Sequence, residues 1–423
     1  APVGPSKRGP VGPIFITGGY EKCTLKTNRP RISVSDNMSE SNWSVPETEV
    51  VQRIHERLDA DGSDVLATIV DVEGNAYRRP GAKMLLDESG TGVGSITAGC
   101  LEDELITTAQ TVRETGRPEL ITYDLMEDDE DIWGLGVGCN GVIDVLLEPL
   151  DETYRPAVEA FDAGADVAVL TVLSENAPAL DRGDRAYYRP HDGQLTLPDG
   201  TTADEWPADA LADPAGDLAE RGRSGVLSVE RGDTTLEVFV DGLAAPAELV
   251  VFGTGHDVGP VTELAERNDF RVTVVGFRGA VDLESRFPAA HRTVTTSPGT
   301  ISEDLELGKR TYAVVMTHNF VDDRLTVETL LDSPAPYIGL MGPHDRFEEM
   351  LEEFETEGTT YTAADLEPLY TPIGLDLGGG SPYQIAHSIV AEVLAVENDR
   401  SPRHLTEREG HIHDRVEVSA AGK

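Results

Sequence analysis

The alternation of apolar strands and helical segments from Glu248 onward constrains the fold most. Residues 249–252 form a continuous apolar run, residues 260–268 a helical pattern, and residues 271–275 a second apolar run, and this alternation continues to residue 396. Continuous apolar runs are typical of parallel strands that are buried on both faces. The pattern predicts a Rossmann-like, doubly wound parallel sheet.

A glycine turn, Gly253-Thr-Gly255-His256-Asp257-Val-Gly259, joins the first predicted strand to the first helix. Glycines permit a tight turn, and a helix N-terminus offers N–H groups to a phosphate. Two features depart from a nicotinamide site: Gly259 comes one position late, and Gly276 stands where an acid usually holds the ribose. Arg278 could bind a 2′-phosphate instead, so NADP is a possible nucleotide. A tight turn without any ligand is the alternative.

Two further segments belong to this C-terminal part. The loop Gly374–Gly380, with Gly378, precedes Ser381, Pro382 and Gln384, which together suit a capped helix start. The loop is a second candidate anion site, and a well-capped helix without a ligand is the alternative. His318 follows a predicted strand on the side where Rossmann ligands bind, although a single histidine there is more often structural.

Two glycine-rich segments in the N-terminal half each carry a cysteine. The first runs from Gly94 through Gly99 and Cys100 to Glu102, at the start of a predicted helix over residues 100–113; the second contains Gly138, Cys139 and Gly141. A helix N-terminus favours thiolate, the form that binds a soft metal or carries sulfur. Cys100 and Cys139 are therefore candidate contacts for a soft metal or for sulfur, and Gly94, Gly99, Glu102, Gly138 and Gly141 are candidate binding residues beside them. Small buried cysteines are the alternative, and the spacing fits no zinc site.

The chain is strongly acidic, with 77 Asp and Glu against 34 Lys and Arg and a net charge of −43. This charge excludes nucleic-acid binding through a general basic surface. We interpret it as a halophilic feature, since molar salt screens self-repulsion. No apolar run approaches the roughly 18 residues that a membrane span needs, and no signal peptide is recognised. The expectation is a cytoplasmic protein with no nucleic-acid or membrane partner.

Composition and pattern suggest four segments. Residues 1–45 form a basic tail, which is disordered or precedes the natural start at Met38, with a basic binding arm as the alternative. Residues 46–245 form a mixed α/β domain, residues 246–397 the Rossmann-like domain, and residues 398–423 a polar tail.

Distinctive motifs occur in both halves of the chain, in the segments Asn75–Met84, Gly94–Glu102, Gly134–Leu150, Phe252–Asp257, Val315–Asn319, Ser333–Gly342 and Pro372–Gly378. Their order and content resemble the XdhC/CoxI family of accessory proteins for xanthine and carbon monoxide dehydrogenases. The similarity covers residues 47–397, with departures at Ala98, Asn140 and Gly276.

The resemblance implies a maturation chaperone rather than an enzyme. Such a protein binds molybdenum cofactor of the molybdopterin type, protects it while a cysteine desulfurase supplies sulfur, and delivers it to an apo molybdenum hydroxylase. The phosphate of the cofactor suits the glycine turns, and its metal–sulfur end suits a thiolate. An NAD(P)-dependent oxidoreductase using His318 and a scaffold without ligand chemistry are the alternatives. Whether the protein forms a homodimer is left open.

Overall fold

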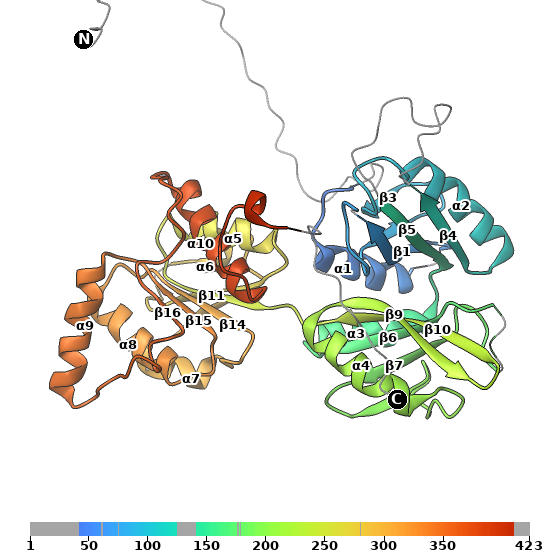
Figure 1. Ribbon diagram of the computed structural model, residues 1–423. Helices are drawn as coiled ribbons and strands as arrows, with labels where there is room; N and C mark the ends of the chain where they lie inside the picture. Colours follow the sequence, from blue (N-terminus) through green and yellow to red (C-terminus); the bar gives the residue numbers. More distant parts are fainter. Residues whose placement is uncertain are drawn as a thin grey trace, which may run out of the picture. The chain divides into compact units, whose positions relative to one another are not determined.

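The computed structural model describes residues 42–60, 62–74, 76–124, 141–175, 177, 179–279 and 281–409, coloured from blue to red in Figure 1. They belong to one compact unit, Ser41–Lys423. Residues 1–41 of the predicted tail, and the segment with Gly138 and Cys139, lie outside the described residues. No helix in the described part has both the length and the apolar character needed to cross a membrane.

The first sheet is antiparallel, with the strand order β3-β2-β1-β5-β4. Alternate residues of β1 face opposite sides, so that Val65 packs toward α2 and Leu66 packs toward α1. The elements are α1 (Glu47–Leu58), β1 (Val65–Gly74), β2 (Lys83–Leu86), β3 (Gly92–Gly94), α2 (Glu102–Thr115), β4 (Glu119–Asp124) and β5 (Gly141–Pro149).

The second sheet is also antiparallel, in the order β8-β7-β6-β10-β9. Helix α4 covers one face through Leu211, Ala215 and Leu218, and β9 and β10 form a hairpin around Gly232. The elements are η1 (Glu152–Tyr154), α3 (Arg155–Asp162), β6 (Val167–Val172), β7 (Arg185–Arg189), β8 (Gln194–Thr196), α4 (Ala208–Arg221), β9 (Ser224–Arg231) and β10 (Thr234–Leu243).

Two buried ion pairs join these two sheets. The Nζ atom of Lys83 on β2 lies 2.7 Å from Oδ2 of Asp241 on β10, and both side chains are about 5% exposed or less. Arg185 on β7 pairs with Glu148 on β5 in the same way. A buried charge without a partner is strongly unfavourable, so each pair holds its two strands in one relative position.

The third sheet is wholly parallel, in the order β13-β12-β11-β14-β15-β16. Its strands are β11 (Glu248–Phe252), β12 (Arg271–Gly276), β13 (Arg292–Thr295), β14 (Thr311–Val315), β15 (Tyr337–Leu340) and β16 (Leu369–Tyr370). The helical segments are α5 (Val258–Glu266), α6 (Leu283–Arg286), η2 (Pro298–Thr300), α7 (Ile301–Asp304), α8 (Phe320–Leu331), α9 (His344–Glu357), α10 (Pro382–Glu397) and η3 (Leu405–Glu407).

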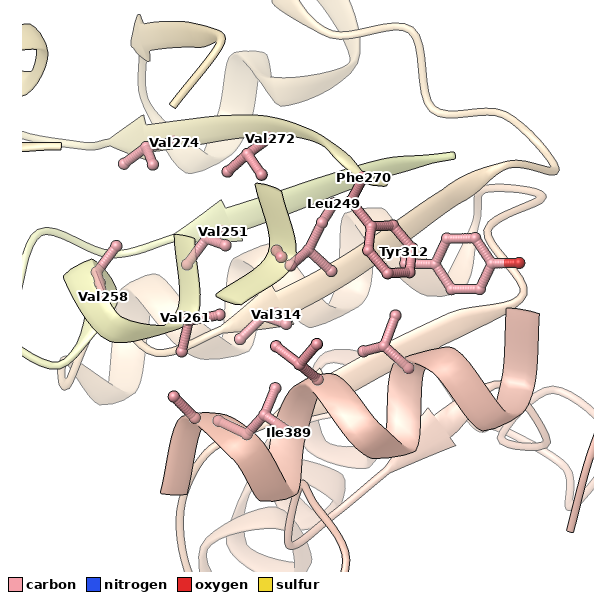
Figure 2. Close-up of a cluster of buried hydrophobic side chains, with 14 of the residues drawn as sticks. Leu249, Val251, Val258, Val261, Phe270, Val272, Val274, Tyr312, Val314 and Ile389 are labelled. Carbon is pink, nitrogen blue, oxygen red and sulfur yellow. The ribbon is translucent and has the colours of Figure 1, made fainter. Parts of the chain in front are cut away.

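Helices cover both faces of the parallel sheet. On one face, side chains of β11, β12 and β14 pack against α5 and α10; Figure 2 shows Leu249, Val251 and Val314 beside Ile389 of α10. On the other face, α8 and α9 pack against residues such as Val250. This double covering explains the continuous apolar strands and confirms the predicted Rossmann-like fold.

Helix α2 begins at Glu102 rather than at Cys100, because residues 97–101 form a loop around the Glu102 side chain. The carboxylate accepts hydrogen bonds from the Thr97 hydroxyl and from the Leu101 N–H. Cys100 therefore lies two residues before the helix, and the predicted helix start was early by that amount.

Candidate functional site

The end of β11 meets the end of β14 at the glycine turn. Gly253 donates its N–H to the carbonyl of Val275 at 3.0 Å. A Cβ atom at Gly253 would lie 2.5 Å from the backbone oxygen of Met316. No real Cβ contact is that close, so only glycine allows the two strand ends to approach in this way.

This point is also the topological switch of the sheet. From β11 the chain proceeds outward to β12 and β13, then returns to the other side of β11 to form β14, β15 and β16. The loops after β11 and β14 therefore lead away from one another, and open α/β sheets bind ligands in the crevice that results. The predicted residues Gly253, Gly255, Asp257 and His318 all lie in these two loops.

A carboxylate orients the histidine of this crevice. Nε2 of His318 lies 2.8 Å from Oδ2 of Asp257. His318 has a φ of +60°, a backbone conformation that residues other than glycine rarely adopt. This contact fixes the ring, which leaves Nδ1 as the nitrogen available to a ligand. His256, in the same turn, is exposed.

The end of β12 carries Gly276 where an ordinary nicotinamide site has an acid, and the space around this glycine is tight. Gly276 is buried, and a Cβ there would lie 3.0 Å from Thr254 and 3.3 Å from Leu283. Arg278 follows in an exposed position, with its Nη2 atom 3.5 Å from a carboxylate oxygen of Asp322. Arg278 thus lies at this edge with its charge partly offset by Asp322, and its binding of a 2′-phosphate stays a prediction.

The loop before α10 differs from the expected anion site. Gly378 is exposed, with a φ of +69°. The Gln384 side chain accepts hydrogen bonds from the N–H groups of Gly380 and Ser381, at 3.0 and 3.2 Å, and Ser381 completes the capping box. The side chain of Gln384 thus already occupies these N–H groups, which supports the capped-helix alternative.

The Cys100 loop is the second group of predicted residues. The Thr97 hydroxyl accepts the Cys100 N–H at 3.0 Å and donates to the buried Glu102 carboxylate. Gly99 is exposed and has a φ of +110°, and a Cβ there would meet no described residue within 4 Å. The loop therefore holds a half-buried cysteine beside an open space.

Gly94 has a structural explanation, and Gly141 lies at the start of a strand. Gly94 ends β3, and a Cβ there would lie 2.5 Å from the carbonyl oxygen of Lys83. Gly141 begins β5 opposite Gly74. Because Gly138 and Cys139 lie outside the described residues, their predicted roles stay predictions. Within the described ranges, no cluster of three or more His, Cys, Asp or Glu residues could hold a metal ion.

A large pocket contains residues that were not predicted as site residues. It has a volume of about 1050 Å³, and Arg78, Arg79 and Lys83 line it. Arg78 also donates to the Ser95 hydroxyl at 3.2 Å, in the loop that leads to Cys100. Two consecutive arginines in so acidic a chain are the sequence feature that could have indicated this pocket. They also belong to the segment Asn75–Met84, which carries part of the family resemblance.

Comparison with known proteins gives consistent results. Residues 57–124 match the family described as XdhC and CoxI family, and residues 249–393 match the family described as XdhC Rossmann domain. The chain is similar to a probable xanthine dehydrogenase subunit of Bacillus subtilis, with 29% identity over 80% of this chain and 96% of that protein. It is also 25% identical to the uncharacterized protein YqeB of Escherichia coli, over 49% of this chain and 38% of that protein.

A solved structure has the same fold. The crystal structure of a xanthine dehydrogenase from Bacillus halodurans superposes with a TM-score of 0.66 at 27% identity, covering 83% of this chain and 96% of that chain. The resemblance identified in the sequence motifs is thereby confirmed.

Proposed function

The chain belongs to the XdhC and CoxI family, and from this premise we propose that it is an accessory factor that binds molybdenum cofactor for a xanthine dehydrogenase-type enzyme. In this proposal it protects the cofactor while a cysteine desulfurase supplies sulfur, and then delivers it to the apoenzyme. The observation that carries the proposal is the Cys100 loop, where Glu102 and Thr97 hold a cysteine beside the open space at Gly99.

The residues of this loop fit such a ligand. Cys100 offers a sulfur donor, which molybdenum and sulfide chemistry favours, and the vacant side of Gly99 lets a flat ring system approach the backbone closely. When bound, the cofactor supplies the metal–sulfur group that the target enzyme uses for catalysis. The chain's own residues bind, orient and shield it, and Cys139 is the second candidate contact.

A second candidate function is binding of NADP by the Rossmann-like sheet, with oxidoreductase activity. Arg278 at the end of β12 and the Asp257–His318 pair favour it, because a guanidinium can bind a 2′-phosphate and an oriented imidazole can move a proton. The absent acid at Gly276 opposes NAD.

Retention of the cofactor tests the main proposal. The protein is purified in molar KCl, incubated with molybdenum cofactor, passed through gel filtration, and oxidised so that retained pterin can be measured by fluorescence. We expect retained pterin in the parent protein and a large loss in Cys100→Ala or Cys139→Ala. Cys23→Ala, the same change outside the described residues, is the matched control.

The alternative outcomes separate the candidate functions. Binding of NADP with no retained pterin favours the oxidoreductase, and binding of neither leaves a scaffold for the partner enzyme. If neither the cysteine variants nor a Gly99→Val variant impairs pterin retention or activation of the partner in cells, the cofactor-carrier proposal is wrong.

A further inference from the structure

The large pocket lies at the edge of the parallel sheet opposite the glycine turn. Its walls include residues 245–247, 268–270 and 310, which come immediately before β11, β12 and β14. The glycine turn and His318 come after the carboxyl ends of β11 and β14. The pocket is therefore distinct from the crevice at the switch point, and the candidate functions above do not use it.

The charge of the pocket differs sharply from that of the chain. The whole chain has 34 basic residues and 77 acidic ones. Among the residues that line the pocket, eight are basic and seven acidic. The basic residues are Arg78, Arg79, Lys83, Arg221, Arg223, Arg267, Arg310 and Arg400. In a protein that repels anions over most of its surface, this local balance lets an anion approach.

Several of these cations already have protein partners. Lys83 pairs with Asp241, Arg78 with Glu47, Arg221 with Asp217 and Arg310 with Asp166. In contrast, the side chains of Arg79, Arg223 and Arg267 make no hydrogen bond or ion pair to any described residue. These three guanidinium groups are the ones that a ligand can bind without displacing a protein contact.

Arg79 is incompletely neutralised by its surroundings. Arg79 is exposed to solvent within the pocket; partial desolvation there lowers the pKa of its guanidinium, and the negative charges of Glu397 and Asp269 oppose that shift. One oxygen of Asp269 is also engaged, because it accepts the backbone N–H of Thr48 at 2.9 Å and the Thr48 hydroxyl at 3.1 Å. A further anion in the pocket would stabilise the charged form of Arg79.

A neutral donor accompanies these cations. Tyr312 lines the pocket, and its ring packs edge-on against Phe270 with centroids 5.9 Å apart. In Figure 2 its oxygen points away from the apolar cluster. Burial raises the pKa of Tyr312 to about 12, so the hydroxyl stays protonated at neutral pH and can donate a hydrogen bond.

We propose that this pocket binds a phosphorylated organic anion of nucleotide size, with Arg79 and Arg267 contacting its phosphate oxygens. A guanidinium presents a planar fork of N–H donors that matches phosphate geometry and binds it in a bidentate manner. The volume of about 1050 Å³ lies at the upper end of the range for small-molecule sites. Inorganic phosphate alone would leave most of this space empty. The proposal does not rest on the cofactor-carrier function.

Calorimetric titration with ADP tests the proposal, with adenosine as the phosphate-free probe and all proteins in the same KCl buffer. We expect ADP to bind and adenosine to bind at least tenfold more weakly. Pyrophosphate should compete with ADP. Arg79→Gln and Arg267→Gln should each weaken ADP binding roughly tenfold, the effect of losing one charged hydrogen-bonding group.

Two matched controls locate the site. Arg117→Gln makes the same charge change at an exposed position that does not line the pocket, and Arg278→Gln makes it at the switch-point crevice. Arg117→Gln should leave the ADP affinity unchanged, whereas Arg278→Gln tests whether ADP binds at the switch-point crevice instead. The proposal is overturned if ADP does not bind, if Arg278→Gln alone abolishes binding, or if Arg79→Gln has no more effect than Arg117→Gln. Pterin retention by the same variants reports separately on the carrier function.

Discussion

The ion pair between Lys83 and Asp241 offers a quantitative test of how the two antiparallel sheets are joined. The Nζ atom of Lys83 lies 2.7 Å from Asp241 and 2.8 Å from the carbonyl oxygen of Gly81. Asp241 also accepts a hydrogen bond from the Ser224 hydroxyl at 2.8 Å. The change Lys83→Met removes the cation and leaves a buried carboxylate with one neutral donor.

The expected loss follows from this geometry. Removing one member of a buried ion pair destabilises a protein by about 3–5 kcal/mol. Because the hydrogen bond from Ser224 still stabilises the carboxylate, the loss of unfolding free energy in Lys83→Met should be near the lower end of this range, at about 3 kcal/mol. In the double variant Lys83→Met with Asp241→Asn no charge is left buried, and an asparagine can keep the bond to Ser224. Its loss should be about 1–2 kcal/mol, because mainly the contact to Gly81 is missing.

Denaturant unfolding in molar KCl, followed by circular dichroism, measures these free energies. Lys309→Met is the matched control, because Lys309 is exposed, and its effect should stay within about 0.5 kcal/mol. The reasoning is refuted if Lys83→Met costs less than about 1 kcal/mol, or if the double variant is no more stable than the single one.

Four further predictions concern the loops, the pH and the salt. Thr97→Val removes the hydroxyl that accepts the Cys100 N–H, so it should destabilise the protein by about 2 kcal/mol and raise the rate at which Cys100 is alkylated, as measured by peptide mass spectrometry. An unchanged alkylation rate would show that Thr97 does not hold the Cys100 loop. Gly253→Ala should lower the free energy of unfolding by more than about 2 kcal/mol, because the new Cβ would clash with the backbone oxygen of Met316. Gly259→Ala, whose Cβ would contact no described residue, should be neutral or slightly stabilising in the same denaturation assay. Burial lowers the pKa of His291, so as the pH falls below about 6.5 the unfolded chain protonates this histidine before the folded protein does, and the free energy of unfolding decreases. In unfolding experiments across that pH range, His291→Asn should show a smaller decrease. The same pH dependence in both proteins would contradict a role for His291. With a net charge of −43, the thermal midpoint should fall on dilution from molar to low KCl, and a midpoint that does not change with salt would rule out the halophilic interpretation.

The carboxyl edge of the parallel sheet was predictable because its signals are local. An apolar strand followed by glycines and a helix identifies one strand end, and His318 follows another strand in the same way. Parallel strands place their carboxyl ends at a common edge, so residues that follow different strands come together there. Gly253 and His318 accordingly lie in neighbouring loops, and the hydrogen bond between His318 and Asp257 completes the group.

The occupied cap before α10 was only partly predictable. The pattern of Ser381 and Gln384 indicates a capping box, and the structure contains one. That Gln384 also takes the N–H group of Gly380 depends on the path of the loop, which no local pattern specifies. The same limit applies to Glu102, whose place in the sequence suggested a helix residue but whose carboxylate organises the loop before it.

The sequence by itself determined the parallel sheet, the glycine turn and the family. A strand buried on both faces appears as a continuous apolar run, and a tight turn appears as closely spaced glycines, so each is encoded in a few consecutive residues. Only the tertiary structure decided that Lys83 meets Asp241, and that Arg79 lines a pocket with Asp269 and Tyr312. These contacts join segments far apart in the chain. Their pairing depends on strand order and packing, and residue type alone does not encode either.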